Sequence, residues 1–235
     1  MPATWGWRVA VIGTILIVFG NAAGIVAGPN TVTVSWAAIA QSAGTVLIVI
    51  VASRWCGLIW AEAGIGRTNL LRSSLIGAGI GLGLAGMVLL ALEAGARLGT
   101  PITYQPLHGA SISDLLTHAL VGLPLLTAIP EELAFRGLLL GLLMRKLTPL
   151  RATLVTSAVF VAWHGVVQLQ TLTVTNFTSP WLIVPAMGLA FAGLFAGGLI
   201  FALLRLRTGN LAAAVMAHWL FDAGLITGLF FLSRS

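Results

Sequence analysis

Residues 113–147 read SDLLTHALVGLPLLTAIPEELAFRGLLLGLLMRKL. Leucine and other apolar residues dominate this stretch on both sides of a short polar group at residues 130–136. A helix needs about 20 mainly apolar residues to cross a bilayer, and this stretch is clearly longer. We therefore expect either one strongly tilted membrane helix or a helix that is broken near Pro130.

The rest of the chain carries the same membrane signal. It is 58% hydrophobic and 8% charged, whereas a soluble domain has about 25% charged residues. The sequence predicts an all-α, polytopic transmembrane helix bundle with seven spanning helices, or eight if the long run is broken. The other six apolar runs cover residues 9–28, 34–53, 74–95, 151–170, 181–204 and 210–232.

The distribution of basic residues predicts the orientation in the membrane. The net charge of +6 is spread singly between apolar runs, which argues against a nucleic-acid surface and leaves the lipid bilayer as the expected surroundings. By the positive-inside rule we expect a cytoplasmic N-terminus and an outer C-terminus, in the plasma (cytoplasmic) membrane. Alternate connections hold only Arg97, whereas the others hold Arg8, Arg54, Arg67, Arg72, Arg145, Lys146, Arg151, Arg205 and Arg207.

The first apolar run has a second interpretation. Arg8 and the small residues Ala22-Ala23-Gly24 also fit a signal peptide with its cleavage site. The run is long enough to span a bilayer, so we expect a retained helix.

Glycines in the run at residues 74–95 predict close helix packing. Residues 81–86 fit G-x-G-x-x-G, but no strand precedes them, so a dinucleotide site is not expected. Pairs at four-residue spacing, Gly77 with Gly81 and Gly79 with Gly83, are typical of membrane helices in close contact.

Six of the ionisable residues within the apolar runs are candidates for chemistry. Such groups are costly inside a bilayer, so we expect them to face the bundle interior and to meet there. We expect this group at mid-depth, opening toward the cytoplasmic half. The residues are Glu131, Glu132 and Arg136 in the fourth run, His164 in the fifth, and His218 and Asp222 in the seventh.

The spacing of these residues suggests different roles. Glu132 and Arg136 are four apart with the acid first, which favours an ion pair. Glu131 points about 100° away on a helix and stays available for chemistry. Pro130 fits the first turn of a helix that restarts here, where the positive end of the helix dipole would keep the glutamates ionised.

Two histidines complete a candidate catalytic group. His164 lies one turn after Phe160 and could polarise a water molecule together with Glu131. His218 shares a helix face with Asp222, which either orients the imidazole or borders a developing oxyanion with it. The alternative for each group is a purely structural ion pair or a buried histidine bonded to a carbonyl.

These three motifs resemble the motif series of the CAAX prenyl endopeptidase and Abi (CPBP) family of intramembrane glutamic proteases. They read Glu131-Glu132-x-x-x-Arg136, Phe160-x-x-x-His164 and His218-x-x-x-Asp222. The resemblance covers roughly residues 110–232. It implies a catalytic core at residues 110–235 that follows N-terminal transmembrane helices at residues 1–109.

The resemblance also implies an activity and a role for each residue. The protein would be a membrane endopeptidase acting on a membrane-associated protein or peptide, of which prenylated CAAX proteins are the best-known kind. Glu131 would be the base with His164 beside it, and Glu132, Arg136 and Phe160 would support the site. His218 and residue 222 would stabilise the oxyanion, but Asp222 can donate a hydrogen bond only when protonated, which favours an orienting role. Those seven residues are the candidate site.

Three other functions fit the same residues. A zinc protease could use Glu131, His164, His218 and Asp222, but no H-E-x-x-H motif is present, so we expect no cofactor. A proton-coupled transporter also needs intramembrane carboxylates and histidines. A non-enzymatic immunity or binding protein could keep the fold without turnover.

Overall fold

The computed structural model describes all residues except 1–2, 29–31, 67–68, 102, 177–178 and 235, so Arg67 lies outside the described residues. The chain is 82% helical. The only strand-like feature in the described part is an isolated antiparallel bridge between Tyr104 and Thr175. Within the described residues, six helices are long and apolar enough to cross a membrane, and the count is seven if a bent helix pair forms one span. The predicted all-α transmembrane bundle is confirmed, and its count is near seven.

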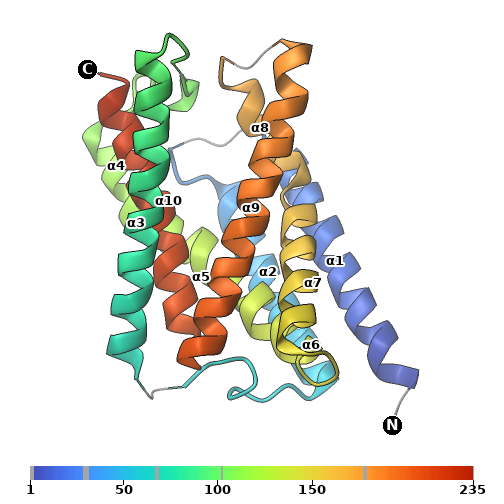
Figure 1. The fold of residues 1–235 in the computed structure, drawn as a ribbon. Coiled ribbons are helices and arrows are strands. Elements are labelled where there is room, and N and C mark those ends of the chain that lie inside the picture. The colour runs from blue at the N-terminus through green and yellow to red at the C-terminus, as the bar shows by residue number, and fades with distance from the viewer. Residues whose placement is uncertain (1–2, 29–31, 67–68, 102, 177–178, 235) are drawn as a thin grey trace.

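The helices form one bundle with the two termini at opposite ends (Figure 1). One side consists mainly of α3 packed along α10, and the other of α7 packed against α9 and α1. The single spans are α1 (Ala3–Ala27), α2 (Trp36–Cys56), α3 (Leu70–Arg97), α9 (Pro180–Thr208) and α10 (Leu211–Leu232). The bent span is α7 (Pro149–Trp163) with α8 (Gly165–Thr173), and a short η1 (Gln105–Leu107) lies in a connection.

The long run is one continuous tilted span and not a broken one. It passes through α4 (Ile112–Thr117), η2 (His118–Ala128), α5 (Ile129–Glu132), η3 (Leu133–Leu139) and α6 (Leu140–Leu143) without a gap. The backbone at Ala128, before Pro130, keeps helical angles of φ −62° and ψ −49°. The expected helix restart at Pro130 is therefore wrong, and its positive helix end is not there to stabilise the glutamates. In Figure 1 the span runs diagonally between the α4 and α6 labels.

Widened turns explain why this span tolerates two prolines. Both η2 and η3 are π-helical, and Pro124 lies inside η2. The N–H of Ile129 bonds the carbonyl of Pro124, five residues earlier. In an α-helix each N–H bonds the carbonyl four residues earlier, and a proline ring clashes with that carbonyl. In the wider π-helical turn the N–H bonds the carbonyl five residues earlier, which leaves room for the proline ring.

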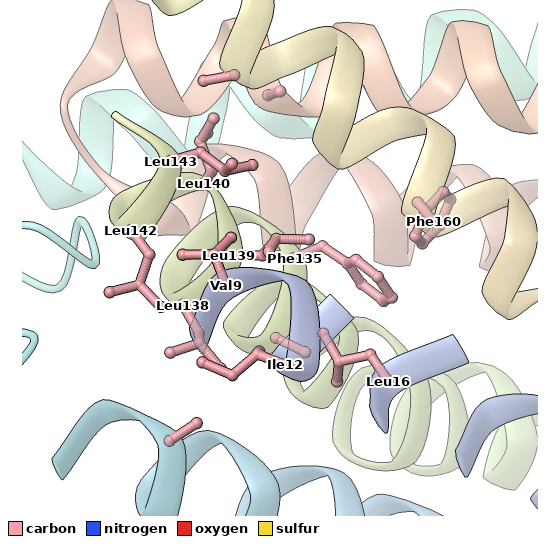
Figure 2. Close-up of a cluster of buried hydrophobic side chains, with 14 of the residues drawn as sticks. Val9, Ile12, Leu16, Phe135, Leu138, Leu139, Leu140, Leu142, Leu143 and Phe160 are labelled. Carbon is pink, nitrogen blue, oxygen red and sulfur yellow. The ribbon is translucent and has the colours of Figure 1, made fainter. Parts of the chain in front are cut away.

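The main hydrophobic core lies between α1, α2, α7 and the second half of the long span. Figure 2 shows Ile12 and Leu16 of α1 beside Phe135 and Leu138 of η3. Ile12 and Leu16 are almost completely buried. The helix α1 thus supplies part of this core, and its retention as a spanning helix stays a prediction.

The connection between α2 and α3 closes the end of the bundle that carries most of the basic residues, here called the basic end. Arg145 donates to both carboxylate oxygens of Glu62 at 2.8 and 2.6 Å. Arg205 donates to the backbone carbonyl of Glu62 at 2.6 Å, and the N–H of Leu211 bonds the carbonyl of Gly64 at 2.8 Å. The hydrogen bonds from Arg145 lower the pKa of Glu62. This connection is thus fixed to the ends of three spans.

Glycines hold α3 against α10, but only half of the expected ones do so. A Cβ on Gly77 or Gly81 would overlap the carbonyl oxygen of Ala213 or Ala217, respectively. Gly79 and Gly83 have open space at the same position, so the packing role expected for that pair is wrong. Residues two apart on a helix face different directions, so only one pair can meet α10.

We predict that Gly81→Ala lowers thermal stability, whereas Gly83→Ala does not. The added methyl would push α3 away from α10, and overpacking of this kind costs about 1–3 kcal/mol. The melting temperature of both variants in the same detergent, read from tryptophan fluorescence, measures the difference. Equal melting temperatures would show that α3 and α10 are not packed as described.

Candidate active site

The long span presents two buried glutamates from α5. Glu132 accepts a hydrogen bond from Arg136 at 2.8 Å, and both side chains are completely buried. A second nitrogen of Arg136 donates to the carbonyl of Gly198 at 3.3 Å. The guanidinium also lies 4.3 Å from the ring centre of Phe160. The ion pair expected from the sequence is therefore present and is held by α7 and α9 as well.

Glu132 has a second partner that the sequence did not indicate. Its Oε1 lies 2.9 Å from Nδ1 of His218, on α10. The contact joins residues 86 positions apart, so no local spacing could reveal it. Glu132 thus connects Arg136 to the histidine.

His164 lies at the break between α7 and α8. The two helices meet at 48°, so the continuous helix expected for residues 151–170 is wrong. Nδ1 of His164 lies 2.8 Å from the carbonyl oxygen of Phe160. A carbonyl only accepts hydrogen bonds, so Nδ1 carries the hydrogen and a neutral imidazole keeps its lone pair on Nε2.

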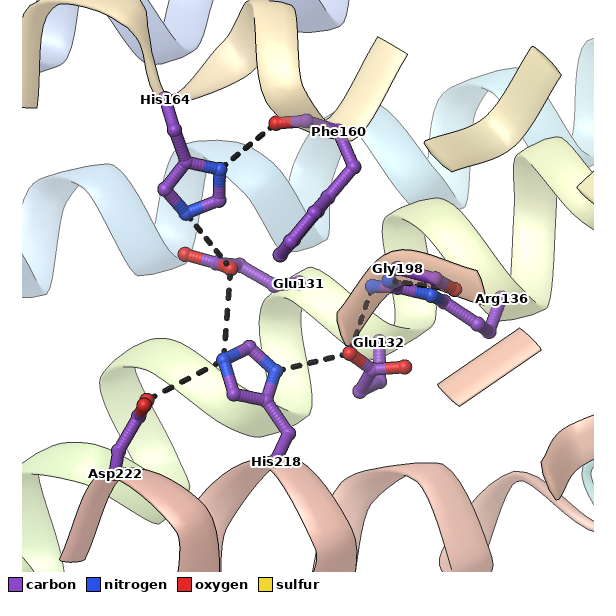
Figure 3. A network of polar contacts seen from close by, with 8 residues as sticks. All are labelled: Glu131, Glu132, Arg136, Phe160, His164, Gly198, His218 and Asp222. Atoms are coloured by element: carbon purple, nitrogen blue, oxygen red, sulfur yellow. Dashed lines mark hydrogen bonds and ion pairs between the residues drawn. The ribbon is translucent and has the colours of Figure 1, made fainter. Parts of the chain in front are cut away.

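Glu131 lies between the two histidines (Figure 3). Its Oε2 is 3.5 Å from Nε2 of His164 and 4.0 Å from Nε2 of His218. This buried oxygen has no hydrogen-bond partner among the described residues. The structure thus brings Glu131, His164 and His218 together, as expected for one site.

His218 lies among three carboxylates. Nδ1 faces Glu132, while Nε2 lies 3.3 Å from Asp222 and farther from Glu131. The ring also stacks on Phe201 with centroids 5.1 Å apart. Both nitrogens face acceptors, so the imidazolium form satisfies both. The contact between Asp222 and Nε2 is the one that an orienting role requires.

The accessible side of this site faces away from the basic end. The side chain of Asp222 is 28% exposed and that of His164 12%, whereas Glu132 and Arg136 are fully covered. The helix α10 begins at Leu211, at the basic end. Asp222 lies one turn beyond His218 along this helix and is therefore farther from the basic end. The sequence predicted an opening toward the cytoplasmic half, and this stays a prediction. Buried side chains of η3 and α6, including Leu138, Leu140 and Leu142, fill the side toward the basic end.

The described residues contain no group of three or more His, Cys, Asp or Glu side chains arranged to hold a metal ion. The zinc alternative therefore has no preformed ligand set in this part of the chain. Independence of metal stays a prediction.

Residues 113–224 match the family model of the type II CAAX prenyl endopeptidase Rce1-like proteins. This segment of the chain is therefore similar to the Rce1-like proteins. It contains all three motifs, including both histidines of the site. Comparison with curated proteins and with solved structures gave no match.

The family match agrees with the membrane character of the chain. The matching model describes prenyl endopeptidases, and the several apolar helices support an integral membrane protein. The matched segment lies inside the core expected at residues 110–235, whose exact boundaries stay a prediction. The roles of the seven site residues are also predictions, taken up below.

We predict that Arg136→Ala destabilises the protein strongly, whereas Arg97→Ala does not. Removing Arg136 leaves Glu132 buried without its cation, which costs about 3–5 kcal/mol. Arg97 makes the same four-residue pair with Glu93 at 2.8 Å, but in an exposed position, where a pair contributes at most about 1 kcal/mol. Thermal unfolding of both variants tests this, and an unchanged melting temperature for Arg136→Ala would contradict it.

Proposed function

We propose that this protein is an intramembrane endopeptidase in which Glu131 and His164 activate a water molecule. The observation that carries the proposal is the pair formed by Glu131 Oε2 and His164 Nε2, 3.5 Å apart. With Nδ1–H bonded to Phe160, both facing atoms are acceptors. A water molecule bridging them would donate one hydrogen to each and keep a lone pair for attack.

In the first step Glu131 takes a proton from this water. The oxygen attacks the carbonyl carbon of the scissile peptide bond, and the carbonyl π electrons move onto its oxygen. His164 holds the water through Nε2, which is kept free by the Nδ1–H bond to Phe160. General base catalysis of this kind contributes about 10²–10⁴-fold in rate.

In the second step the tetrahedral intermediate collapses. The His218 imidazolium, held by Glu132 and oriented by Asp222, provides positive charge for the oxyanion. The C–N bond breaks as Glu131 returns its proton to the leaving nitrogen. Glu131 then ends the cycle as a carboxylate, so atoms and charge balance without a covalent intermediate.

The substrate is a membrane-associated protein or peptide, and a prenylated CAAX-type chain is the kind that the family description suggests. The proposed direction of approach is from the side away from the basic end, because Asp222 is the most exposed of the charged side chains there. With the N-terminus in the cytoplasm of a plasma membrane, the scissile bond enters from the non-cytoplasmic half. The glutamate mechanism uses no metal ion.

We predict that Glu131→Gln folds and abolishes cleavage. The amide keeps the shape but cannot accept the proton, so the rate falls by about 10²–10⁴-fold. The assay uses a quenched fluorescent CAAX-type peptide in farnesylated and unmodified forms, with purified protein in lipid nanodiscs. Glu93→Gln, on the exposed surface, is the matched control and keeps full activity.

Three outcomes of that assay would contradict the proposal. Retained cleavage by Glu131→Gln would remove the glutamate mechanism. Loss of wild-type cleavage in a chelator, restored by zinc, would indicate the metalloprotease. Absence of cleavage of both peptides by the wild type would favour the transporter or the immunity protein.

We predict that position 222 is reached by reagents from the face opposite the basic end. In a Cys56→Ser background, Asp222→Cys should react with a membrane-impermeant maleimide in right-side-out vesicles and be protected in inverted vesicles. Arg207→Cys, exposed at the basic end, should show the reverse. Reaction of both positions from the same side would refute the proposed approach of the substrate.

A further inference from the structure

The helix break that carries His164 needs partners for the backbone groups that it separates. In a straight helix the N–H of Val166 would bond the carbonyl of Ala162, four residues earlier. Here the side chain of Asn21, on α1, lies between them. Its Nδ2 donates to the carbonyl of Ala162 at 2.8 Å, and its Oδ1 accepts from the N–H of Val166 at 2.8 Å. One carboxamide thus replaces one backbone hydrogen bond.

The remaining contacts of Asn21 fix its orientation. Its second Nδ2 hydrogen goes to the carbonyl of Ile17 at 2.8 Å, within its own helix. A flipped amide would direct its NH₂ group at the N–H of Val166 and leave two carbonyls facing an oxygen. Gly165 leaves room for the amide, because a Cβ there would lie 3.0 Å from Oδ1 of Asn21.

The break also decides which nitrogen of His164 carries the hydrogen. The backbone N–H of His164 bonds Val161 at 3.0 Å, three residues back, and so leaves the carbonyl of Phe160 free. That carbonyl accepts from Nδ1 of His164 instead. If α7 continued straight through the break, the backbone N–H of His164 would compete for the Phe160 carbonyl. The Nε2 lone pair facing Glu131 therefore depends on the break.

We propose that Asn21 is a positioning residue for the reaction, acting through the helix break on the orientation and tautomer of His164. The inference rests on the proposed role of His164 in binding the water. It extends the catalytic machinery to α1, outside the segment 113–224 that matches the family. Asn21 itself touches no reacting atom.

A second amide between the same helices provides a matched control. Nε2 of Gln170, on α8, donates to the carbonyl of Gly24 on α1 at 3.0 Å. This bond also joins α1 to α8, but it lies beyond the break and touches none of its backbone groups. A merely structural link between α1 and α8 would make the two amides equivalent.

The kinetic test compares Asn21→Leu with Gln170→Leu, using the quenched CAAX-type peptide in nanodiscs. Misplacing a group that positions the reaction by about 1 Å can lower the rate about 10²-fold. We expect Asn21→Leu to lower kcat by about this factor with KM unchanged, and Gln170→Leu to keep kcat even if both melt at lower temperature. Equal kcat losses in the two variants would overturn the proposal.

Asn21→Asp gives a conservative rescue. A neutral carboxylic acid offers one donor and one acceptor, so it can bond both Ala162 and Val166, whereas the carboxylate cannot donate to Ala162. The activity of this variant relative to wild type should therefore rise as the pH is lowered. A ratio that does not change with pH would contradict the double role of the amide.

A spectroscopic readout tests the inference without any substrate. With ¹⁵N-labelled histidine, the imidazole shifts of His164 report which nitrogen carries the hydrogen, and a His164→Gln sample assigns them among the four histidines. We expect wild type and Gln170→Leu to show the Nδ1–H form and Asn21→Leu to lose it. An unchanged tautomer in Asn21→Leu would refute the proposal, even if the protein cleaves no peptide.

Discussion

Every backbone N–H and C=O inside a bilayer must find a partner within the protein, because the hydrocarbon offers none. This constraint explains where the chain departs from regular helix. The long span replaces α-helical turns with wider ones around Pro124, and the fifth span breaks at His164 only where a side chain of α1 bonds the separated groups. Glu131 lies between the wider turns of η2 and η3, and His164 lies at the break, so both irregularities lie at the candidate site.

Charge balance is the second constraint on this site. Glu131, Glu132 and Asp222 bring three carboxylates to one region, whose fixed cation is Arg136. Buried charges are costly unless they are paired, so His218 supplies a second positive charge. A doubly protonated His218 between Glu132 and Asp222 pairs two of the three, and Glu131 keeps His164 as its neighbour. Removing any one member should therefore affect the protonation of the others, as in other coupled sites.

The sequence predicted the membrane bundle, the fourth-run ion pair and the meeting of three motifs, because these follow from hydrophobicity and from local spacing. It did not predict the contact between Glu132 and His218, which depends on how α5 and α10 pack. It also missed the break at His164 and the role of Asn21, although an asparagine within an apolar span was a signal that could have been used. Local patterns show which residues need partners, whereas tertiary packing decides which partners they find.

The identity of residue 222 connects charge balance to chemistry. An asparagine there could donate a hydrogen bond to an oxyanion, whereas an ionised aspartate can only accept. With Asp222 3.3 Å from Nε2 of His218 and Glu132 2.9 Å from Nδ1, the acid instead stabilises the imidazolium. The His218 imidazolium then takes the place of the N–H donor that an asparagine at position 222 would offer to the oxyanion. Because the ring is held on both sides and stacked on Phe201, its positive charge is fixed in place before the oxyanion forms.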